Sequence, residues 1–421
     1  MTYCCARVYE KDRVFYDRFS TLCIQHYKKN ETKYYQLGYE TFGIILYGFC
    51  QWLIEDLKKE KIDRILFCSR DGFIIHEAFN LIPGHTDFKT DYIYVSRRSL
   101  RVPLLHFCHE NKSKAIFATR YITIYDLLDS IGLDPTEYKN AVEMNNLSFE
   151  TVIEDKDIEN NKKVVGLIDA VWADVVANSE KEYINAQQYI KSLNVVDEVA
   201  IVDIGWRGSI QFYLQQMLKA MGSSVKLRGY YITLTSSMLR GQSMRGYFHN
   251  VDEDSIGCDL LRGYVGLIEM MFLKQEGSTK CYREDGFPVL TPYEYLENGK
   301  YTYEVEAVKD IQRGALDCIR DIVAENITEQ FAPETAFANL ERYAKHPSMK
   351  DVRMFSSFRF FNNGTVSYLT GENSLAFNLL HPREMIRDFY GSRWRIGFLK
   401  KNFKIVLPYN MLFNMIMKIK L

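Results

Sequence analysis

A run of apolar residues, 65–68, ends abruptly in the polar tetrapeptide Ser-Arg-Asp-Gly, and a helical pattern follows. Such a segment at the end of a strand offers two kinds of chemistry. The carboxylate of Asp71 would hold Mg²⁺ or act as a catalytic general base, and the guanidinium of Arg70 would bind a phosphate. Ser69 adds a hydroxyl for substrate binding, and Gly72 permits close approach of the backbone. The alternative is a simple helix start, in which Asp71 caps the helix and Gly72 turns the chain.

A second polar segment follows the apolar run 199–202 and combines a carboxylate with glycines. Asp203 opens this segment and suits a metal ion, a sugar hydroxyl or a catalytic role. Four further residues are candidates for substrate binding: Gly205, Arg207, Gly208 and Ser209. The glycines expose backbone N–H groups where a helix begins, and the positive end of that helix attracts a phosphate. Since the spacing matches neither a Walker A loop nor the GxGxxG fingerprint, the alternative is that the glycines only shape a turn.

Three arginines and two serines follow the strand-like run 92–95. Arg97, Arg98 and Arg101 would line the same edge as Asp71 and form a phosphate clamp, because guanidinium groups bind phosphate oxygens in pairs. The first two arginines are the candidates for substrate binding. The alternative is the start of a basic helix on the surface.

Three more titratable residues are weaker candidates. Glu269 stands alone in the apolar run 267–272. Because an unpaired buried carboxylate is costly, this residue either pairs with an arginine or faces the site as a catalytic residue. Asp169 follows the apolar run 164–168 and is a further candidate at the end of a strand. We expect His76, on the helix after the first polar segment, to pack against the protein or to face solvent.

Elements of an α/β fold are expected to position these residues. Short apolar runs rich in β-branched residues alternate with helical patterns between residues 62 and 257. The expected strands are 62–68, 91–95, 164–168, 198–202 and 227–234, and the clearest helices are 72–81, 183–193 and 209–221. This order predicts a Rossmann-like α/β domain with a mainly parallel sheet and helices on both faces. Since ligands bind at the carboxyl ends of such strands, the two polar segments should lie side by side.

Helical patterns flank this domain and interrupt it. Residues 1–61 are expected to form an N-terminal helical segment, residues 115–162 a helical insertion, and residues 258–421 a C-terminal helical region. The tail, 392–421, carries seven Lys or Arg residues and several aromatic rings, with no acidic residue. This tail either lies on an anionic membrane surface or docks on the protein by its apolar face.

Composition excludes several classes of protein. The chain has 421 residues, 47% of them hydrophobic and 25% charged, and its net charge of −1 provides no global field to attract nucleic acid. The nine cysteines contain no CxxC pair, which predicts reduced thiols and no structural zinc. Charges near the first residue argue against a signal peptide, and the uncharged stretch 405–417 has 13 residues, too few to span a bilayer. We therefore expect a cytoplasmic protein.

Several segments resemble a bacterial family of predicted hydrolases in the haloacid dehalogenase (HAD) superfamily: 39–53, 66–72, 94–99 and 202–209. Members of that family occur among capsule, O-antigen and other surface-polysaccharide proteins and are often fused to glycosyltransferases. The resemblance covers roughly residues 35–400. The superfamily signature Asp-x-Asp-x-Thr is missing, since 252–254 has the Asp spacing but follows no apolar strand. The chain thus resembles the second half of longer relatives, in which a dehalogenase-like domain comes first.

The resemblance implies a role in surface-polysaccharide biosynthesis, and the polar segments indicate phosphate chemistry. We expect a HAD-like hydrolase or a transferase that acts on a phosphorylated sugar or nucleotide-sugar with the help of Mg²⁺, held by Asp71 and Asp203. The alternative is a non-catalytic sugar-phosphate-binding or scaffolding module that partners a glycosyltransferase. Either protein would work in the cytoplasm, or at the inner face of the membrane through the tail 392–421.

Overall fold

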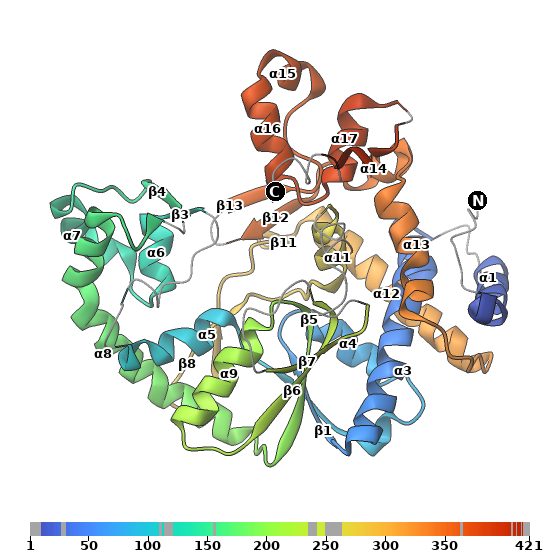
Figure 1. The fold of residues 1–421 in the computed structure, drawn as a ribbon, viewed down its shortest axis with the longest axis horizontal. Coiled ribbons are helices and arrows are strands. Elements are labelled where there is room, and N and C mark those ends of the chain that lie inside the picture. Colours follow the sequence, from blue (N-terminus) through green and yellow to red (C-terminus); the bar gives the residue numbers. More distant parts are fainter. Residues whose placement is uncertain are drawn as a thin grey trace.

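A five-stranded sheet forms the centre of the molecule in the computed structural model (Figure 1). The structure describes residues 10–26, 31–108, 112, 121–154, 157–234, 242–248, 263–362, 365–405, 407–409, 411–413 and 415. Across the sheet the strands are β2 (Lys89–Ile93), β1 (Arg64–Cys68), β5 (Glu198–Trp206), β6 (Lys226–Leu234) and β7 (Ser243–Gly246). Each neighbouring pair is parallel. The predicted Rossmann-like α/β fold is therefore confirmed.

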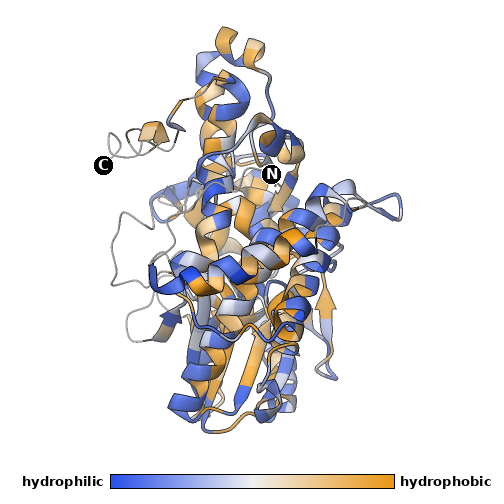
Figure 2. Ribbon diagram, turned by 90° about the vertical axis from the view of Figure 1, so that its right-hand side faces the viewer, coloured by the Kyte–Doolittle hydropathy of each residue, from blue (hydrophilic) through white to orange (hydrophobic). Residues whose placement is uncertain are grey.

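Helices cover both faces of this sheet, because successive side chains of a strand point to opposite sides. Ile65 and Phe67 belong to a core that includes α3 (Gly43–Glu60) and α4 (Gly72–Phe79). Leu66 and Cys68 belong to a second core with α5 (Arg97–Arg101), α8 (Lys162–Ser192) and α9 (Ser209–Ala220). A strand that is buried on both faces gives a continuous apolar run, which is the pattern of β1. Figure 2 shows the hydrophobic colours along the strands at the lower end of the molecule.

One predicted strand is wrong, since residues 164–168 lie in α8, a helix of 31 residues. The buried residues at its start, Val164, Leu167, Ile168 and Val171, recur at helical spacing. Their β-branched side chains suggested a strand, but they pack on a neighbouring lobe of the protein instead. Asp169 consequently follows no strand. Its exposed carboxylate on α8 pairs with Lys112 at 2.6 Å, away from the sheet edge.

The other four predicted strands differ from the prediction in their bounds, β1 and β6 only in where they begin. β5 continues beyond 202 to Trp206, because its residues from Asp203 onward still pair with β6. Asp203 therefore lies within the strand, and the loop that follows is shorter than predicted. The strand predicted at 91–95 begins two residues earlier and ends at Ile93.

Between α5 and α8 the chain forms a small lobe with its own core. Its elements are η4 (Val102–Phe107), β3 (Tyr121–Thr123), α6 (Ile124–Ser130), η6 (Pro135–Tyr138), α7 (Lys139–Met144) and β4 (Val152–Glu154). Buried residues of α6 and α7, such as Leu128 and Val142, pack on the first half of α8. The region predicted as a helical insertion thus contains two α-helices and also an antiparallel pair, β3 with β4.

The N-terminal helices lie against a helix from the other end of the chain. The short elements η1 (Glu10–Asp12), α1 (Arg13–Gln25), α2 (Lys33–Leu37) and the π-helical turn η2 (Gly38–Phe42) precede α3, and α12 (Tyr303–Ala324) packs on them. Glycines permit this contact. A Cβ on Gly38 would stand 1.9 Å from the carbonyl oxygen of Ile311, and a Cβ on Gly314 would stand 2.1 Å from that of Tyr35. The two ends of the chain therefore share one core.

The C-terminal region is mainly helical but also contains short hairpins that the sequence did not suggest. Besides α12, its helices are α11 (Val265–Phe272), α13 (Pro333–Lys345), α14 (Met349–Phe355), α15 (Leu375–Leu380), α16 (Pro382–Gly391) and α17 (Arg395–Phe403). The hairpin strands are β8 (Thr279–Tyr282) with β9 (Pro288–Leu290), β10 (Leu296–Glu297) with β11 (Lys300–Tyr301), and β12 (Arg359–Asn362) with β13 (Thr365–Tyr368). The remaining 3-10 turn, η3 (His85–Asp87), precedes β2. No helix in the described part of the chain has the length and apolarity to cross a membrane.

Candidate functional site

Asp71 and Asp203 lie together at the carboxyl edge of the sheet. β1 pairs directly with β5, and Phe67 lies beside Val202. The segments that follow these two residues therefore leave the sheet next to each other. The two carboxylates are close enough for the charge of Asp71 to raise the pKa of Asp203. The two polar segments therefore lie side by side, as the order of strands predicts.

Burial governs the protonation of this pair of carboxylates. The pKa of Asp71 is raised to about 7, chiefly by burial and in part by the charge of Glu269, while the charges of Arg70 and Arg97 oppose this rise. Burial also raises the pKa of Asp203 well above its ordinary value, with Asp71 as the next cause. A buried carboxyl pair of this kind retains a proton near neutral pH, so one member can donate a proton while the other accepts one.

The carboxylate of Asp71 does not cap α4. Asp71 occupies the N-cap position with helical values of φ (−69°) and ψ (−31°), and its side chain makes no capping hydrogen bond. Ser96, at the same position before α5, instead forms a complete capping box with Ser99. A simple helix start therefore does not account for Asp71. Gly72 meets the expected close approach, because a Cβ there would lie 3.0 Å from the carbonyl carbon of Phe67.

The arginines after β2 divide between the site and the structure around it. Arg97 is exposed, and its charge lowers the pKa of both carboxylates. Arg98 lies on another side of α5, where it donates a hydrogen bond of 2.7 Å to Glu182 on α8. Neighbouring residues of a helix point about 100° apart, which explains the split. Arg101 is buried and donates to the carbonyl oxygen of Ser130 at 2.7 Å.

Arg70 and Ser69 both make contacts that hold the loop after β1. Arg70 pairs with Glu294 at 3.2 Å, and its charge also acts on the nearby Asp71. The Ser69 hydroxyl is buried, donates to the carbonyl oxygen of Val95 at 2.9 Å and accepts from the N–H of the same residue at 3.1 Å. Ser69 thus ties the ends of β1 and β2 together, and the Ser69–Arg70 peptide bond is cis.

The segment after Asp203 turns sharply into α9. Gly205 has a φ of +121° and lies so close to β6 that a Cβ would stand 2.0 Å from the carbonyl oxygen of Thr233. Gly208 caps α9 with a φ of +65°, and Ser209 is the first residue of that helix. Arg207 is exposed between them. The turn thus requires both glycines, and the polar groups that lie beside it are Arg207, Ser209 and the backbone N–H groups at the start of α9.

Glu269 was expected either to pair with an arginine or to face the site, and it does both. It lies on α11 and forms an ion pair with Arg393, which precedes α17. Its charge also raises the pKa of Asp71, so the pair adjoins the two aspartates. The basic tail therefore reaches the site from one side through Arg393, which agrees with the expected alternative that the tail docks on the protein.

A lysine surrounded by aromatic rings forms another wall of the candidate site. The sequence did not predict this arrangement. The Lys274 Nζ lies 4.1 Å from the ring centre of Tyr92 and 4.7 Å from that of Phe73, and it pairs with Glu276 at 2.8 Å. The Tyr92 hydroxyl donates to Glu276 at 2.6 Å. The charge of Asp71 contributes to the raised pKa of Tyr92, so this cage borders the site.

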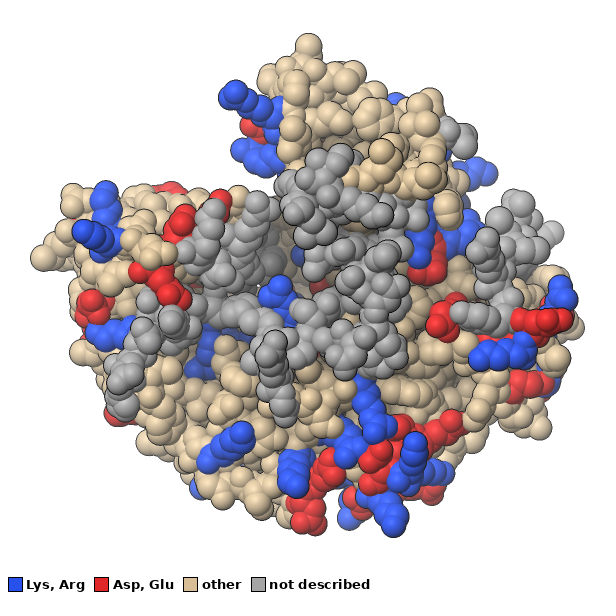
Figure 3. Space-filling model, in the orientation of Figure 1, with Lys and Arg blue, Asp and Glu red and all other residues tan. Residues whose placement is uncertain are grey.

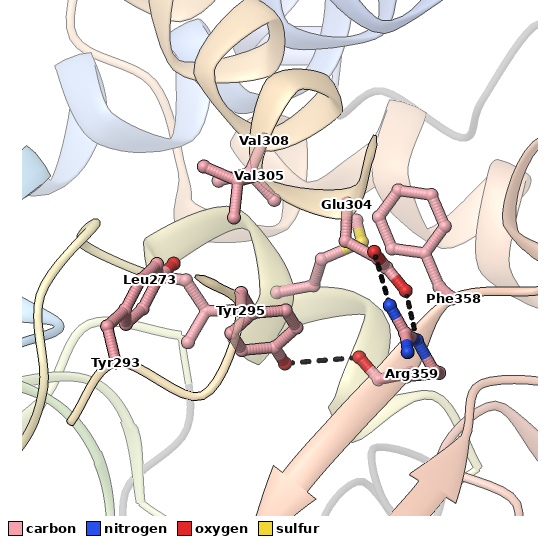
Figure 4. A pocket seen from close by; sticks show the side chains of 9 residues that line it. Leu273, Tyr293, Tyr295, Glu304, Val305, Val308, Phe358 and Arg359 are labelled. Atoms are coloured by element: carbon pink, nitrogen blue, oxygen red, sulfur yellow. Dashed lines mark hydrogen bonds and ion pairs between the residues drawn. The ribbon is translucent and has the colours of Figure 1, made fainter. Parts of the chain in front are cut away.

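A small cavity of about 10 Å³ lies behind the segment that carries Glu294 (Figure 4). Glu304 accepts hydrogen bonds from Arg359 at 2.7 and 3.3 Å, and the Tyr295 hydroxyl donates to the Arg359 carbonyl oxygen at 3.1 Å. These groups satisfy one another, and the cavity has room for about one water molecule. The segment 293–295 lies close to Arg70, because burial raises the pKa of Tyr293 and Tyr295 and the charge of Arg70 opposes that rise.

His76 packs as expected. Its ring stacks on Phe67 with centres 4.7 Å apart, and Nε2 lies 3.0 Å from the Thr90 hydroxyl. Burial lowers its pKa, which favours the neutral ring. This histidine supports the back of α4 and does not belong to the candidate site.

The two aspartates fit Mg²⁺ that arrives with a phosphate. Among the described residues no group of three or more His, Cys, Asp or Glu side chains could hold a metal ion. Mg²⁺ does not need such a cage, because it commonly takes one or two protein carboxylates together with water and phosphate oxygens. Asp71 and Asp203 supply that donor set, and a divalent cation would relieve the repulsion between them.

Arg97, Arg207 and the two aspartates thus give this edge both signs of charge, which suits an anionic ligand with a reacting hydroxyl or phosphate. Comparison with known proteins adds no assignment to this geometry. No protein-family model matches the sequence, and no curated protein matches it either.

Proposed function

We propose that the protein is an enzyme that acts on a phosphorylated sugar or nucleotide-sugar during the assembly of a bacterial surface polysaccharide. The observation that carries the proposal is the pair Asp71 and Asp203, which interact at the carboxyl edge of the sheet beside Arg97. The polysaccharide context comes from the resemblance of the polar segments to the haloacid dehalogenase-like family described above.

The chain's own residues supply acid–base chemistry and phosphate binding. Burial raises the pKa of both aspartates, that of Asp71 to about 7, so the pair retains a proton near neutral pH. The protonated carboxyl would donate this proton to the leaving oxygen, and the other carboxylate would accept one from the attacking hydroxyl or water. Arg97 and Arg207 are exposed on neighbouring segments and would bind the phosphate oxygens. Mg²⁺ that arrives with the phosphate would be held by the two ionised aspartates in place of the shared proton and would neutralise charge on the phosphate.

The catalytic role is tested with two aspartate variants and a matched control. We expect Asp71→Asn and Asp203→Asn each to lower kcat/KM at least about 100-fold on a phosphorylated sugar or nucleotide-sugar, with Mg²⁺ present. Asp169→Asn removes an equally negative but exposed carboxylate on α8 and should leave the rate unchanged. Full activity of Asp71→Asn would overturn the catalytic assignment. Binding without turnover by the wild-type protein would favour the alternative, a sugar-phosphate-binding module.

The phosphate-binding role is tested with two adjacent arginines. Arg97→Ala should weaken binding of a nucleotide-sugar by about 1.5–3 kcal/mol, the range for hydrogen bonds to a charged group. Arg98→Ala removes the same charge one residue away, but this side chain contacts Glu182, so affinity should change little while stability falls. Calorimetry measures the affinities and thermal unfolding the stabilities. Equal affinities of the two variants would contradict the assignment of Arg97.

A further inference from the structure

The helical hairpin formed by α15 and α16 projects from the molecule and exposes large apolar side chains. It stands at the top of Figure 1, away from the sheet, and Figure 2 shows the uppermost helix in hydrophobic colours. Leu379 is 62% exposed and Leu380 77% exposed, at the turn between the two helices. Phe377 on α15 and Ile386 on α16 are exposed as well. Adjacent leucines that project from a convex tip have no partner within the described protein.

The apolar surface continues from the tip toward α17. A groove of about 1060 Å³ runs beside α16, and Ile386 belongs both to the groove and to the exposed face. Its other walls are mostly apolar, including Met385, Phe398, Phe403 and Leu412. A patch of this extent on a protein surface marks a place of contact with another molecule or a membrane.

Charge distinguishes this end of the molecule from the rest. The described residues 371–405 contain seven Lys or Arg and three Asp or Glu, a net charge of +4, whereas the first 370 residues of the sequence carry −7. Figure 3 shows blue side chains on the flank of the projecting lobe and uncharged atoms at its tip. Arg383 is exposed one turn from the leucines, and Lys404 is exposed after α17.

The basic tail contributes less of this surface than its sequence suggests. Arg393 pairs with Glu269, and Lys401 donates to the carbonyl oxygen of Gly371 at 2.7 Å. Trp394 and Phe398 are fully buried, so the start of the tail docks on the protein by its apolar face, whereas several apolar side chains further along it are exposed: Phe403, Ile405, Leu407, Met411 and Met415. Leu379 and Leu380 on the hairpin of α15 and α16 are among the most exposed apolar side chains of this end of the molecule, and further exposed apolar residues follow α17.

We infer that the hairpin of α15 and α16 binds an anionic membrane surface, with Leu379 and Leu380 inserted among the lipids. A bilayer accepts projecting apolar side chains without a complementary pocket, and its anionic headgroups attract the surrounding cations. A protein partner would need a matching cavity for the two leucines. The combination of a convex apolar tip with a positive flank fits the bilayer better.

Vesicle sedimentation with the full chain tests this inference. Wild-type protein should bind vesicles of phosphatidylcholine with about 30% phosphatidylglycerol, should bind pure phosphatidylcholine vesicles weakly, and should dissociate as salt is raised. The double variant Leu379→Asp/Leu380→Asp should lower the partition coefficient at least about tenfold. Met144→Asp is the matched control, since Met144 is 83% exposed on the distant α7, and it should bind like wild type.

Other outcomes would overturn the inference. Wild-type protein that fails to bind the anionic vesicles, or a double variant that binds them as well as wild type, would exclude this surface. Self-association that the leucine substitutions abolish would assign the hairpin to a second copy of the chain. Circular dichroism checks the fold, and Leu379→Ser/Leu380→Ser serves as the second variant if the aspartates disturb it.

Discussion

The raised pKa of Asp71 lowers the free energy of unfolding of the protein at neutral pH. Its pKa is raised to about 7 in the folded protein, chiefly by burial, against 3.8 for an ordinary aspartate. Between these two values the folded chain binds more protons at Asp71 than the unfolded chain does. The free energy of unfolding contributed by this residue is therefore highest below about pH 4 and falls as the pH rises toward 7.

This sign gives a prediction for Asp71→Asn. Asparagine does not ionise, so the variant should unfold at a higher temperature than wild type at pH 8, by roughly 1–3 °C, and the gap should close toward pH 5. Thermal unfolding between pH 5 and 8 measures both curves, with Asp169→Asn as the control. A variant whose melting temperature stays parallel to that of wild type would show that Asp71 ionises normally.

At the scale of single residues the sequence located the centre of the site but not its walls. Asp71 and Asp203 could be found because each stands beside an apolar strand of a parallel sheet, and the fold then brings such positions together. The pairing of Glu269 with Arg393 and the cage around Lys274 join segments far apart in the chain. The sequence around a charged residue does not predict which distant residue its side chain will contact.

Among the elements, β5 and the turn after it place the second carboxylate. Gly205 combines a φ of +121° with contact to the Thr233 carbonyl oxygen, whereas Gly222 has a φ of +73° and open space around it. Gly222→Ala should cost about 1 kcal/mol, the cost of a left-handed conformation. Gly205→Ala should cost more than about 3 kcal/mol, because β5 and β6 must also separate. Chemical denaturation measures the free energy of unfolding of both variants. Equal losses of stability would mean that β6 moves away from Gly205 without an energetic cost.

The start of helix α8 shows that hydrophobic periodicity alone does not always distinguish a helix from a strand. Its first residues, 164–168, are rich in valine and isoleucine and short enough to suggest a buried strand, yet they continue into a helix of 31 residues. A short apolar run is compatible with a buried strand and with a buried helix, because either element could pack its apolar side chains against the small lobe. Four of the five strands of the parallel sheet were predictable because polar residues follow each apolar run, whereas β7 was not predicted, since Tyr247 and Phe248 follow it.

For the molecule as a whole, the contact between the two ends of the chain sets the stability of the helical part. Gly314→Ala would place a methyl group where the Tyr35 carbonyl oxygen lies, so α12 must move away from α2. We expect a loss of about 2–4 kcal/mol, whereas Gly391→Ala, in open space on α16, should change stability by less than about 0.5 kcal/mol. Denaturant titration compares the variants, and a neutral Gly314→Ala would show that α12 is free to shift.

The same contact has a consequence for how the protein is made. The Tyr39 hydroxyl donates to Asp321, a residue 282 positions later in the chain. A ribosome that adds about 5–20 residues per second needs roughly 15–60 s to synthesise that distance. Throughout that time the face of α2 and α3 that α12 will cover has no partner in the nascent chain. Helices α2 and α3 therefore complete their packing only after α12 has been synthesised, and chaperones have that whole interval in which to bind them.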